Sequence, residues 1–207
     1  YGLDWKFLSL CKKLNLWIFI MVKKLKILKD EDYERGKIPM TKFPIRAETF
    51  FRLAISEGER FLDIGVGTGS IAVQAALLGA EVTGIDQSSE AVELTYKNAK
   101  KHGVSLHLIC GKAPADLPDM LFDKIFIGGA SKALAETVAY AAKHLKQQGV
   151  IAANFILTSS LETFLRELRN RGFIDIESGL RQTATLSEHD LWKGENPIYI
   201  VSARRGL

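Results

Sequence analysis

Three glycines at alternate positions, directly after a short apolar run, constrain this chain more than any other feature. Residues 61–64 read Phe-Leu-Asp-Ile, and Gly65, Gly67 and Gly69 follow them. Glycine accepts positive φ angles and, without a Cβ, lets a ligand approach the backbone closely. A strand that enters such a loop and leaves it as a helix exposes backbone N–H groups at the turn. The spacing therefore predicts a small-molecule site here.

The glycine spacing separates two kinds of nucleotide site. In a dinucleotide-binding loop the third glycine comes three positions after the second, whereas Gly69 comes two positions after Gly67. Asp63 stands two residues before the first glycine, and a carboxylate there favours an ammonium group and disfavours a pyrophosphate. S-adenosylmethionine carries an ammonium group and no phosphate, so the loop favours this methyl donor.

A second acidic residue supports the same cofactor. Asp86 closes the apolar run at 82–85, about 20 residues beyond the glycines, where a ribose-binding carboxylate belongs in a βαβ unit. The competing interpretation is a structural turn in which Asp86 only caps the next helix. Because Asp63, the glycines and Asp86 stand in register, we favour the methyl-donor site.

Length and charge limit the class of protein. The chain has 207 residues, 47% of them hydrophobic, which is enough for one domain with a full core. Its net charge is +4. Residues 1–20 carry three lysines against one aspartate and so supply +2 of this, which leaves the remainder close to neutral. A nucleic-acid binder would show clustered Lys and Arg, so we expect no nucleic-acid partner, although a polyanionic small molecule is compatible.

The two cysteines indicate a compartment rather than a site. Cys11 and Cys110 have neither the spacing of a zinc site nor an evident disulfide role. We therefore expect no metal site and a location in the reducing cytoplasm. Cys110 is expected to be a small apolar filler within a strand.

The amino-terminal stretch is expected to lie outside the fold. Residues 14–20 are mostly apolar, with Lys12 and Lys13 upstream. The run is too short to span a bilayer, no small-residue cleavage site follows, and Met21 would make an ordinary cytosolic start. We expect an extension over 1–20 and a single domain over 21–207; a peripheral amphipathic anchor is the less favoured alternative.

The rest of the chain alternates between apolar runs and helical patterns, which predicts a doubly wound α/β fold with helices on both faces of the sheet. Thr41 is a candidate N-cap for a helix that runs to about residue 55. The segments 173–177 and 198–202 are strand-like, with no crossover helix between them. They predict an antiparallel pair at one edge of a seven-stranded, mostly parallel sheet. Five parallel strands are expected at 61–64, 81–86, 106–110, 124–127 and 150–155, and four further helices at 71–78, 88–102, 134–145 and 161–171.

Ligands of open α/β sheets bind beyond the carboxyl ends of the strands. Four loops should therefore form the site, at 65–70, 86–87, 111–114 and 128–131. Backbone N–H groups around Ala113 are candidates for contact with an adenine edge, with a simple turn as the alternative.

Several segments together carry a family resemblance. They are the glycine loop, the approach at 36–47 with Pro-Met-Thr-Lys at 39–42, Ile-Gly-Gly at 127–129 and Asn-Pro-Ile-Tyr-Ile at 196–200. Between about residues 30 and 205 the chain closely resembles the decarboxylating cobalt-precorrin carbon-15 methyltransferases of anaerobic cobalamin biosynthesis. The resemblance implies a Rossmann-like class I methyltransferase that uses S-adenosylmethionine. It would methylate C15 of cobalt-precorrin-6B and remove the carboxylate of the C12 acetate on ring C, giving cobalt-precorrin-7.

The resemblance also assigns cofactor contacts. Lys112 stands where relatives often carry an acid, which argues against a carboxylate contact to the adenine amine but leaves a backbone contact at Ala113. A homo-oligomer is implied as well, with the C5-methyltransferase of the same pathway as a functional partner. The 207 residues hold no fused second methyltransferase domain, which favours the cobalt-first route. With Asp63 added for its charge, the assigned cofactor contacts are Thr41, Asp63, Gly65, Val66, Gly67, Thr68, Gly69, Asp86 and Ala113.

The implied reaction requires few catalytic groups from the protein. An electron-rich ring carbon can attack a sulfonium methyl directly once the two are aligned, so neither a metal nor a nucleophile is expected. The remaining task is to hold a substrate that bears many carboxylates. Lys42, Arg46, Arg181 and Lys193 are candidates for this, and His189 is a candidate proton donor. The competing interpretation of each is a solvated surface charge.

Two other functions stay open. Asn196-Pro197-Ile198-Tyr199 is similar to the Asn-Pro-Pro-Tyr box of enzymes that methylate amino groups of bases. That box follows the fourth strand, where Ile-Gly-Gly stands in this chain, so the late position favours a turn into the last strand. Nucleic-acid or protein methylation therefore ranks second. A non-catalytic module that only binds the cofactor ranks third, and the intact loop with both acids argues against it.

Overall fold

The computed structural model describes residues 27–128 and 133–206. The extension expected at 1–20 lies outside the described residues, and so do residues 129–131 of the fourth loop. In the described part of the chain, no helix combines the length and apolar character needed to cross a bilayer.

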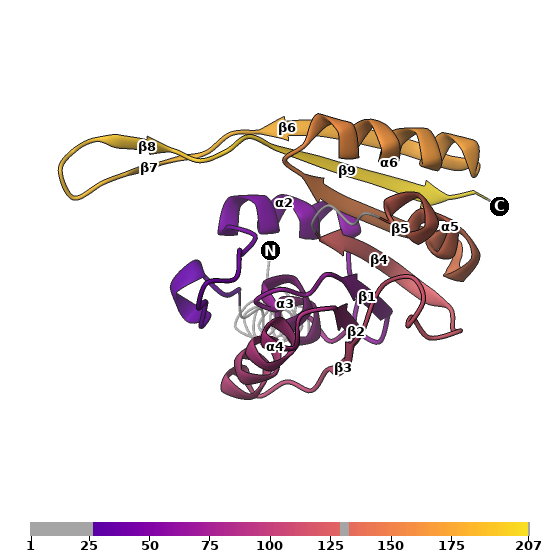
Figure 1. Ribbon diagram of the computed structural model, residues 1–207, viewed down its shortest axis with the longest axis horizontal. Coiled ribbons are helices and arrows are strands. Elements are labelled where there is room, and N and C mark those ends of the chain that lie inside the picture. Colours follow the sequence, from indigo (N-terminus) through magenta and orange to yellow (C-terminus); the bar gives the residue numbers. More distant parts are fainter. Residues whose placement is uncertain (1–26, 129–132, 207) are drawn as a thin grey trace, which may run out of the picture.

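A seven-stranded sheet with the order β3-β2-β1-β4-β5-β9-β6 forms the centre of the molecule (Figure 1). Strands β1 to β5 pair in parallel, and β9 runs antiparallel to both of its neighbours, β5 and β6. The mostly parallel sheet and the antiparallel pair at its edge are confirmed. The strands are β1 (Arg60–Ile64), β2 (Glu81–Asp86), β3 (His107–Cys110), β4 (Phe122–Gly128), β5 (Leu145–Phe155), β6 (Phe173–Arg181) and β9 (Ile198–Arg205).

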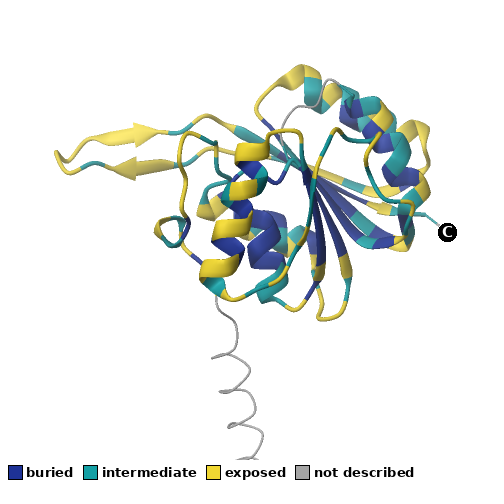
Figure 2. Ribbon diagram, turned by 60° about the horizontal axis from the view of Figure 1, so that its bottom comes forward, coloured by how far each residue is buried: buried dark blue, intermediate teal, exposed yellow. Residues whose placement is uncertain are grey.

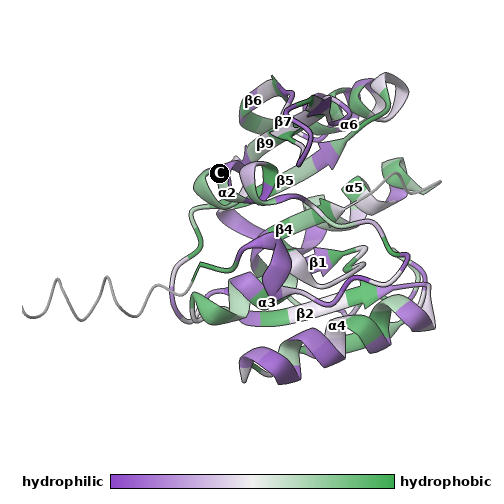
Figure 3. Ribbon diagram, turned by 90° about the vertical axis from the view of Figure 1, so that its left-hand side faces the viewer, coloured by the Kyte–Doolittle hydropathy of each residue, from purple (hydrophilic) through white to green (hydrophobic). Residues whose placement is uncertain are grey.

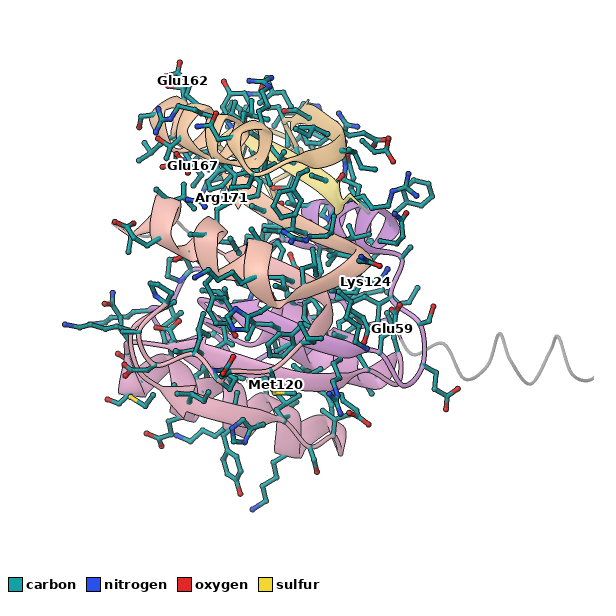
Figure 4. The ribbon with its side chains drawn as sticks, turned by 90° about the vertical axis from the view of Figure 1, so that its right-hand side faces the viewer. Glu59, Met120, Lys124, Glu162, Glu167 and Arg171 are labelled. Atoms are coloured by element: carbon teal, nitrogen blue, oxygen red, sulfur yellow. The ribbon has the colours of Figure 1, made fainter. Side chains whose placement is uncertain are left out.

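The chain order reverses between β1 and β4. Strands β1, β2 and β3 follow one another outward, after which the chain returns to the other side of β1 as β4. This is the switch point at which open α/β sheets bind ligands, beyond the carboxyl ends of the strands. At the opposite, amino-terminal ends of these strands, Lys124 of β4 forms an ion pair with Glu59, the residue before β1, at 3.6 Å (Figure 4).

Helices cover both faces, because alternate residues of each central strand point to opposite sides. Leu62 and Ile64 pack with α5 and α6 on one face, and Phe61 packs with α2 and α3 on the other. The central strands are the most deeply buried elements (Figure 2), and the outer helix α4 carries many hydrophilic residues (Figure 3). The helices are α2 (Phe43–Leu53), α3 (Ser70–Leu77), α4 (Ser89–His102), α5 (Leu134–His144), α6 (Thr158–Asn170) and the 3-10 helix η1 (Asp30–Asp32).

Two local predictions are wrong. The N-cap of α2 is Lys42, not Thr41, and Pro44 occupies the first turn, where its missing N–H has no helical partner to lose. Cys110 lies in β3 as expected, but its side chain is exposed because β3 is an edge strand.

A two-stranded ribbon was not predicted. β7 (Ala184–Leu186) and β8 (Trp192–Gly194) pair antiparallel and carry the chain away from the sheet between β6 and β9 (Figure 1). Its strands are exposed on both sides, so the alternation of buried and exposed residues that marks a sheet strand is absent.

Candidate active site

A cavity of about 690 Å³ lies at the carboxyl ends of the parallel strands, at the switch point. Its two ends differ in origin. The cofactor end is formed by segment 38–41, the β1–α3 loop with Asp63, and the start of the β2–α4 connection with Asp86. The acceptor end is formed by Phe126 and Gly128 of β4, residues 154–157 at the end of β5, and Ile198 of β9.

The glycine loop is shaped by contacts within the protein as much as by space for a ligand. Gly65, Gly67 and Gly69 have φ angles of 85°, 54° and 76°. A Cβ on Gly65 would lie 2.3 Å from the carbonyl oxygen of Gly128, and one on Gly69 would lie 2.7 Å from Cγ2 of Thr95. At Gly67 the nearest atom would be 3.4 Å away. Gly65 and Gly69 are therefore required by packing, and Gly67 leaves its backbone accessible at the cavity.

Asp86 connects the glycine loop to the start of the next helix through hydrogen bonds. One carboxylate oxygen accepts a hydrogen bond from the N–H of Gly67 at 3.1 Å, and the other accepts from the N–H of Ser88 at 3.0 Å. Each oxygen keeps a further lone pair for another donor. The carboxylate can therefore receive a pair of ligand hydroxyls without leaving the loop.

Asp63 is a buried carboxylate without a counter-charge. Its exposed fraction is 1%, and neither of its oxygens has a hydrogen-bond partner among the described residues. Burial and, second, the negative charge of Asp86 raise its pKa to about 8. The backbone N–H of Ala72 faces the carboxyl group outside hydrogen-bond geometry and lowers this pKa by a smaller amount. Such a group is costly unless a ligand compensates it, so its position in the cavity wall points to a cationic ligand.

Segment 28–41, of which residues 38–41 line the cofactor end, is fixed by a buried arginine. Arg46 donates to the carbonyl oxygens of Leu28 at 2.7 Å and Thr41 at 2.8 Å, and to the carboxylate of Asp30 at 3.1 Å. Its exposed fraction is 2%, and it does not line the cavity. This placement contradicts the predicted substrate contact, because one guanidinium group ties together the two ends of the segment.

Asn98 joins the same segment to the glycine loop. It pairs with the backbone of Glu34 through both ends of its amide, at 2.8 and 2.9 Å, and donates to the carbonyl oxygen of Thr68 at 2.9 Å. Sequence reasoning missed this residue. The available signal was a polar side chain on the buried face of α4, beside Thr95 and Ala99.

The other predicted site residues are dispersed. Ala113 does not line the cavity and packs against the core on the α5 side. Lys42 adjoins Thr41, Arg181 forms an ion pair with Glu48, and His189 and Lys193 are exposed on the ribbon. The cavity wall brings together Thr41, Asp63, Gly65, Val66, Gly67, Thr68 and Asp86, and Gly69 adjoins it as the N-cap of α3.

The acceptor end contains residues that no sequence motif marked. Asn154, Ile156 and Leu157 belong to no pattern beyond the end of a strand. Ile198 lies in the Asn-Pro-Ile-Tyr segment, which was predicted to be only a turn into the last strand, and yet it lines the cavity.

Comparison with known proteins assigns the family. The model of the precorrin methyltransferase domain matches residues 31–205. The chain belongs to this family.

Precorrin methyltransferase relatives match along nearly their whole length. A protein of Saccharolobus solfataricus named "Probable cobalt-precorrin-6B C(15)-methyltransferase (decarboxylating)" is 36% identical over 195 residues, which cover 85% of this chain and 94% of the relative. The Salmonella typhimurium protein "Cobalt-precorrin-6B C(15)-methyltransferase (decarboxylating)" is 28% identical over 185 residues, covering 86% and 96%. The crystal structure of precorrin-6y C5,15-methyltransferase from Geobacter metallireducens superposes with a TM-score of 0.81 at 26% identity, covering 86% and 96%.

Proposed function

We propose that this precorrin methyltransferase domain transfers a methyl group from S-adenosylmethionine to C15 of cobalt-precorrin-6B. The same reaction releases the carboxylate of the C12 acetate as CO2 and gives cobalt-precorrin-7. The observation that carries the proposal is the cavity at the switch point, which has an unpaired buried carboxylate at one end and apolar side chains at the other. The names of the relatives give the acceptor and the decarboxylation.

S-adenosylmethionine fits the residues of the cofactor end. Asp63 would hold its ammonium group, Asp86 its ribose hydroxyls, and the backbone around Gly67 its nucleoside. Thr41 would close the cavity from segment 28–41. When bound, the cofactor supplies an electrophilic methyl group on a positively charged sulfur. The protein aligns this methyl group with the acceptor and excludes water, and alignment of this kind accelerates a reaction strongly.

The proposed reaction balances without an acid or base from the protein. A ring electron pair would form the new bond from C15 to the methyl carbon, while the bond between that carbon and the sulfonium sulfur breaks and leaves its electron pair on the sulfur. Before or after this step, the bond between the acetate methylene and its carboxylate breaks and returns a pair to the ring. One positive charge and one negative charge disappear together. This balance suits a cavity in which, among the described lining residues, Asp63 and Asp86 are the ionisable ones.

The remaining expectations are proposals of the same kind. We retain a single domain over 21–207, a cytoplasmic location, a homo-oligomer and the C5-methyltransferase as a functional partner. The homo-oligomer is supported by the ribbon, whose Leu186, Leu191 and Trp192 are exposed although they are large and apolar. Lys42 is the remaining candidate near the cavity for a substrate carboxylate.

One assay tests the proposed function. The purified protein is incubated with S-adenosylmethionine and cobalt-precorrin-6B, and the product is analysed by mass spectrometry with trapping of CO2. We expect a product that has gained one methyl group and lost one CO2. A methylated product that keeps its acetate would remove the decarboxylation. Methylation of RNA or protein in place of the tetrapyrrole would overturn the assignment.

A further inference from the structure

A polar side chain at the acceptor end has no part in the mechanism so far. Asn154 is the next-to-last residue of β5, lines the cavity, and pairs in register with Gly128 of β4. Gly128 in turn lies against Gly65, because a Cβ added to Gly65 would lie 2.3 Å from the carbonyl oxygen of Gly128. Asn154 therefore stands two strands away from the glycine loop, on the same edge of the sheet.

A buried hydrogen bond fixes the side-chain amide. The hydroxyl of Thr49 in α2 is fully buried and donates to the carbonyl oxygen of Ile45 at 2.8 Å. A hydroxyl has one proton, so the Thr49 oxygen serves as the acceptor for Nδ2 of Asn154, at 3.1 Å. This arrangement takes precedence over a donation from Thr49 to Oδ1 of Asn154, which lies 3.3 Å away. Asn154 keeps one N–H and its Oδ1 for a ligand.

Among the described residues, those that share this end of the cavity with Asn154 are apolar. Phe155, Ile156, Leu157 and Ile198 line the same end of the cavity. Ile156 and Leu157 are 59% and 56% exposed, which is a high exposure for adjacent large hydrophobic residues and is typical of a ligand-binding surface. A flat macrocycle laid on these residues would carry its side chains to the amide of Asn154.

We propose that Asn154 binds the acetate carboxylate that leaves as CO2 and orients it relative to the ring. This inference rests on the proposed function. A neutral N–H donor directs the carboxylate, whereas a lysine or arginine would stabilise its charge before the reaction and so raise the barrier to losing it. The apolar neighbours favour neutral CO2 over the carboxylate. The electron pair of the broken C–C bond enters the ring, which gives up one pair to the new methyl group, so no oxidant or reductant is needed.

The test measures CO2 release and cofactor binding separately. In Asn154→Ala we expect single-turnover CO2 release to fall at least about tenfold, as for a lost hydrogen bond to a charged group. The Kd for S-adenosylmethionine, measured by calorimetry, should stay within about twofold of that of the unchanged protein. Asn154→Asp has the same shape but repels a carboxylate, and it should lose more CO2 release than the alanine variant. Asn170→Ala, an exposed position at the end of α6, is the matched control and should leave both quantities unchanged.

A variant of the hydrogen-bond partner tests the same role without changing Asn154 itself. Thr49→Val preserves shape and removes the hydroxyl that fixes the amide, so CO2 release should fall about threefold with cofactor binding intact. If both Asn154 variants release CO2 normally, this inference fails and the proposed function stands. The same holds if Asn154→Ala loses cofactor affinity to the same extent as it loses CO2 release. If the unchanged protein neither methylates the tetrapyrrole nor releases CO2, the proposed function fails, and the inference fails with it.

Discussion

The two ends of the cavity are built in different ways. The cofactor end comes mainly from one stretch of chain, from Asp63 to Asp86, in which a strand, a loop and a helix follow one another. The acceptor end is assembled from the ends of β4, β5 and β9, which are far apart in sequence and meet only in the folded sheet. The cofactor end is therefore determined by local sequence, and the acceptor end by the register of the sheet.

The largest expected effect comes from Gly65, where the two ends meet. Gly65→Ala places a Cβ 2.3 Å from the carbonyl oxygen of Gly128, at a φ angle of 85°. We expect a loss of about 4 kcal/mol in the free energy of unfolding, from backbone strain and steric overlap together.

Gly58→Ala is the matched control for that substitution. Gly58 has a φ angle of 80°, and nothing lies within 4 Å of its added Cβ. Strain alone should cost about 1 kcal/mol there. Denaturant unfolding of both variants measures the difference, and equal losses would show that the contact between Gly65 and Gly128 is unimportant.

The next effect concerns the ribose carboxylate. Asp86→Ala removes the acceptor for the N–H groups of Gly67 and Ser88 and the proposed hydroxyl contacts. We expect affinity for S-adenosylmethionine to fall at least about 100-fold, as for hydrogen bonds to a charged group. Calorimetric titration measures the Kd, with Glu162→Ala on the outer surface as the control. An unchanged Kd would contradict the assignment of Asp86.

Asp63 predicts a pH dependence that a surface aspartate would not show. Its pKa is about 8 in the cofactor-free protein, so near neutral pH an ammonium ligand must displace a proton from the carboxyl group. Affinity should rise as pH increases toward 8, by up to about tenfold per unit. Titrations in buffers of different ionisation enthalpy should detect the released proton. Asp63→Asn should abolish both the release and most of the binding.

Asp63 gives folding stability the opposite pH dependence: stability falls as pH rises, whereas cofactor affinity increases. Because the folded pKa of Asp63 is raised from 3.8 to about 8, the folded protein holds an extra proton between these values. This proton's contribution to the free energy of unfolding is fully present below pH 3.8. It is lost as pH rises to 8, by up to about 1.4 kcal/mol per pH unit. Cofactor-free Asp63→Asn should therefore be more stable than the unchanged protein at pH 8. Denaturation curves that shift equally with pH in both proteins would contradict this.

The contrast between the two ends explains what the sequence could predict. The strands, most helices and the cofactor end follow from apolar periodicity and the spacing of Asp63, Gly65 and Asp86, which are local properties. Charge type alone selected Arg46 as a substrate contact, but burial gave it a structural role. Asn154 carries no local signal, and the Asn-Pro-Ile-Tyr segment indicates only a turn at Ile198, because the place of both residues in the cavity arises from strand order and register.

The smallest expected effect tests the acceptor end away from Asn154. Leu157 is 56% exposed and lies just before α6, so Leu157→Ala should change the free energy of unfolding by no more than about 0.5 kcal/mol. If the macrocycle lies on this residue, the KM for the tetrapyrrole should rise about fivefold, from the apolar area left uncovered, while the Kd for S-adenosylmethionine stays constant. Leu180→Ala, at another half-exposed leucine outside the cavity wall, should leave the KM unchanged. A rise in KM for Leu180→Ala alone would move the acceptor surface from the end of β5 to β6, because the two residues have similar exposure and differ in their place on the sheet.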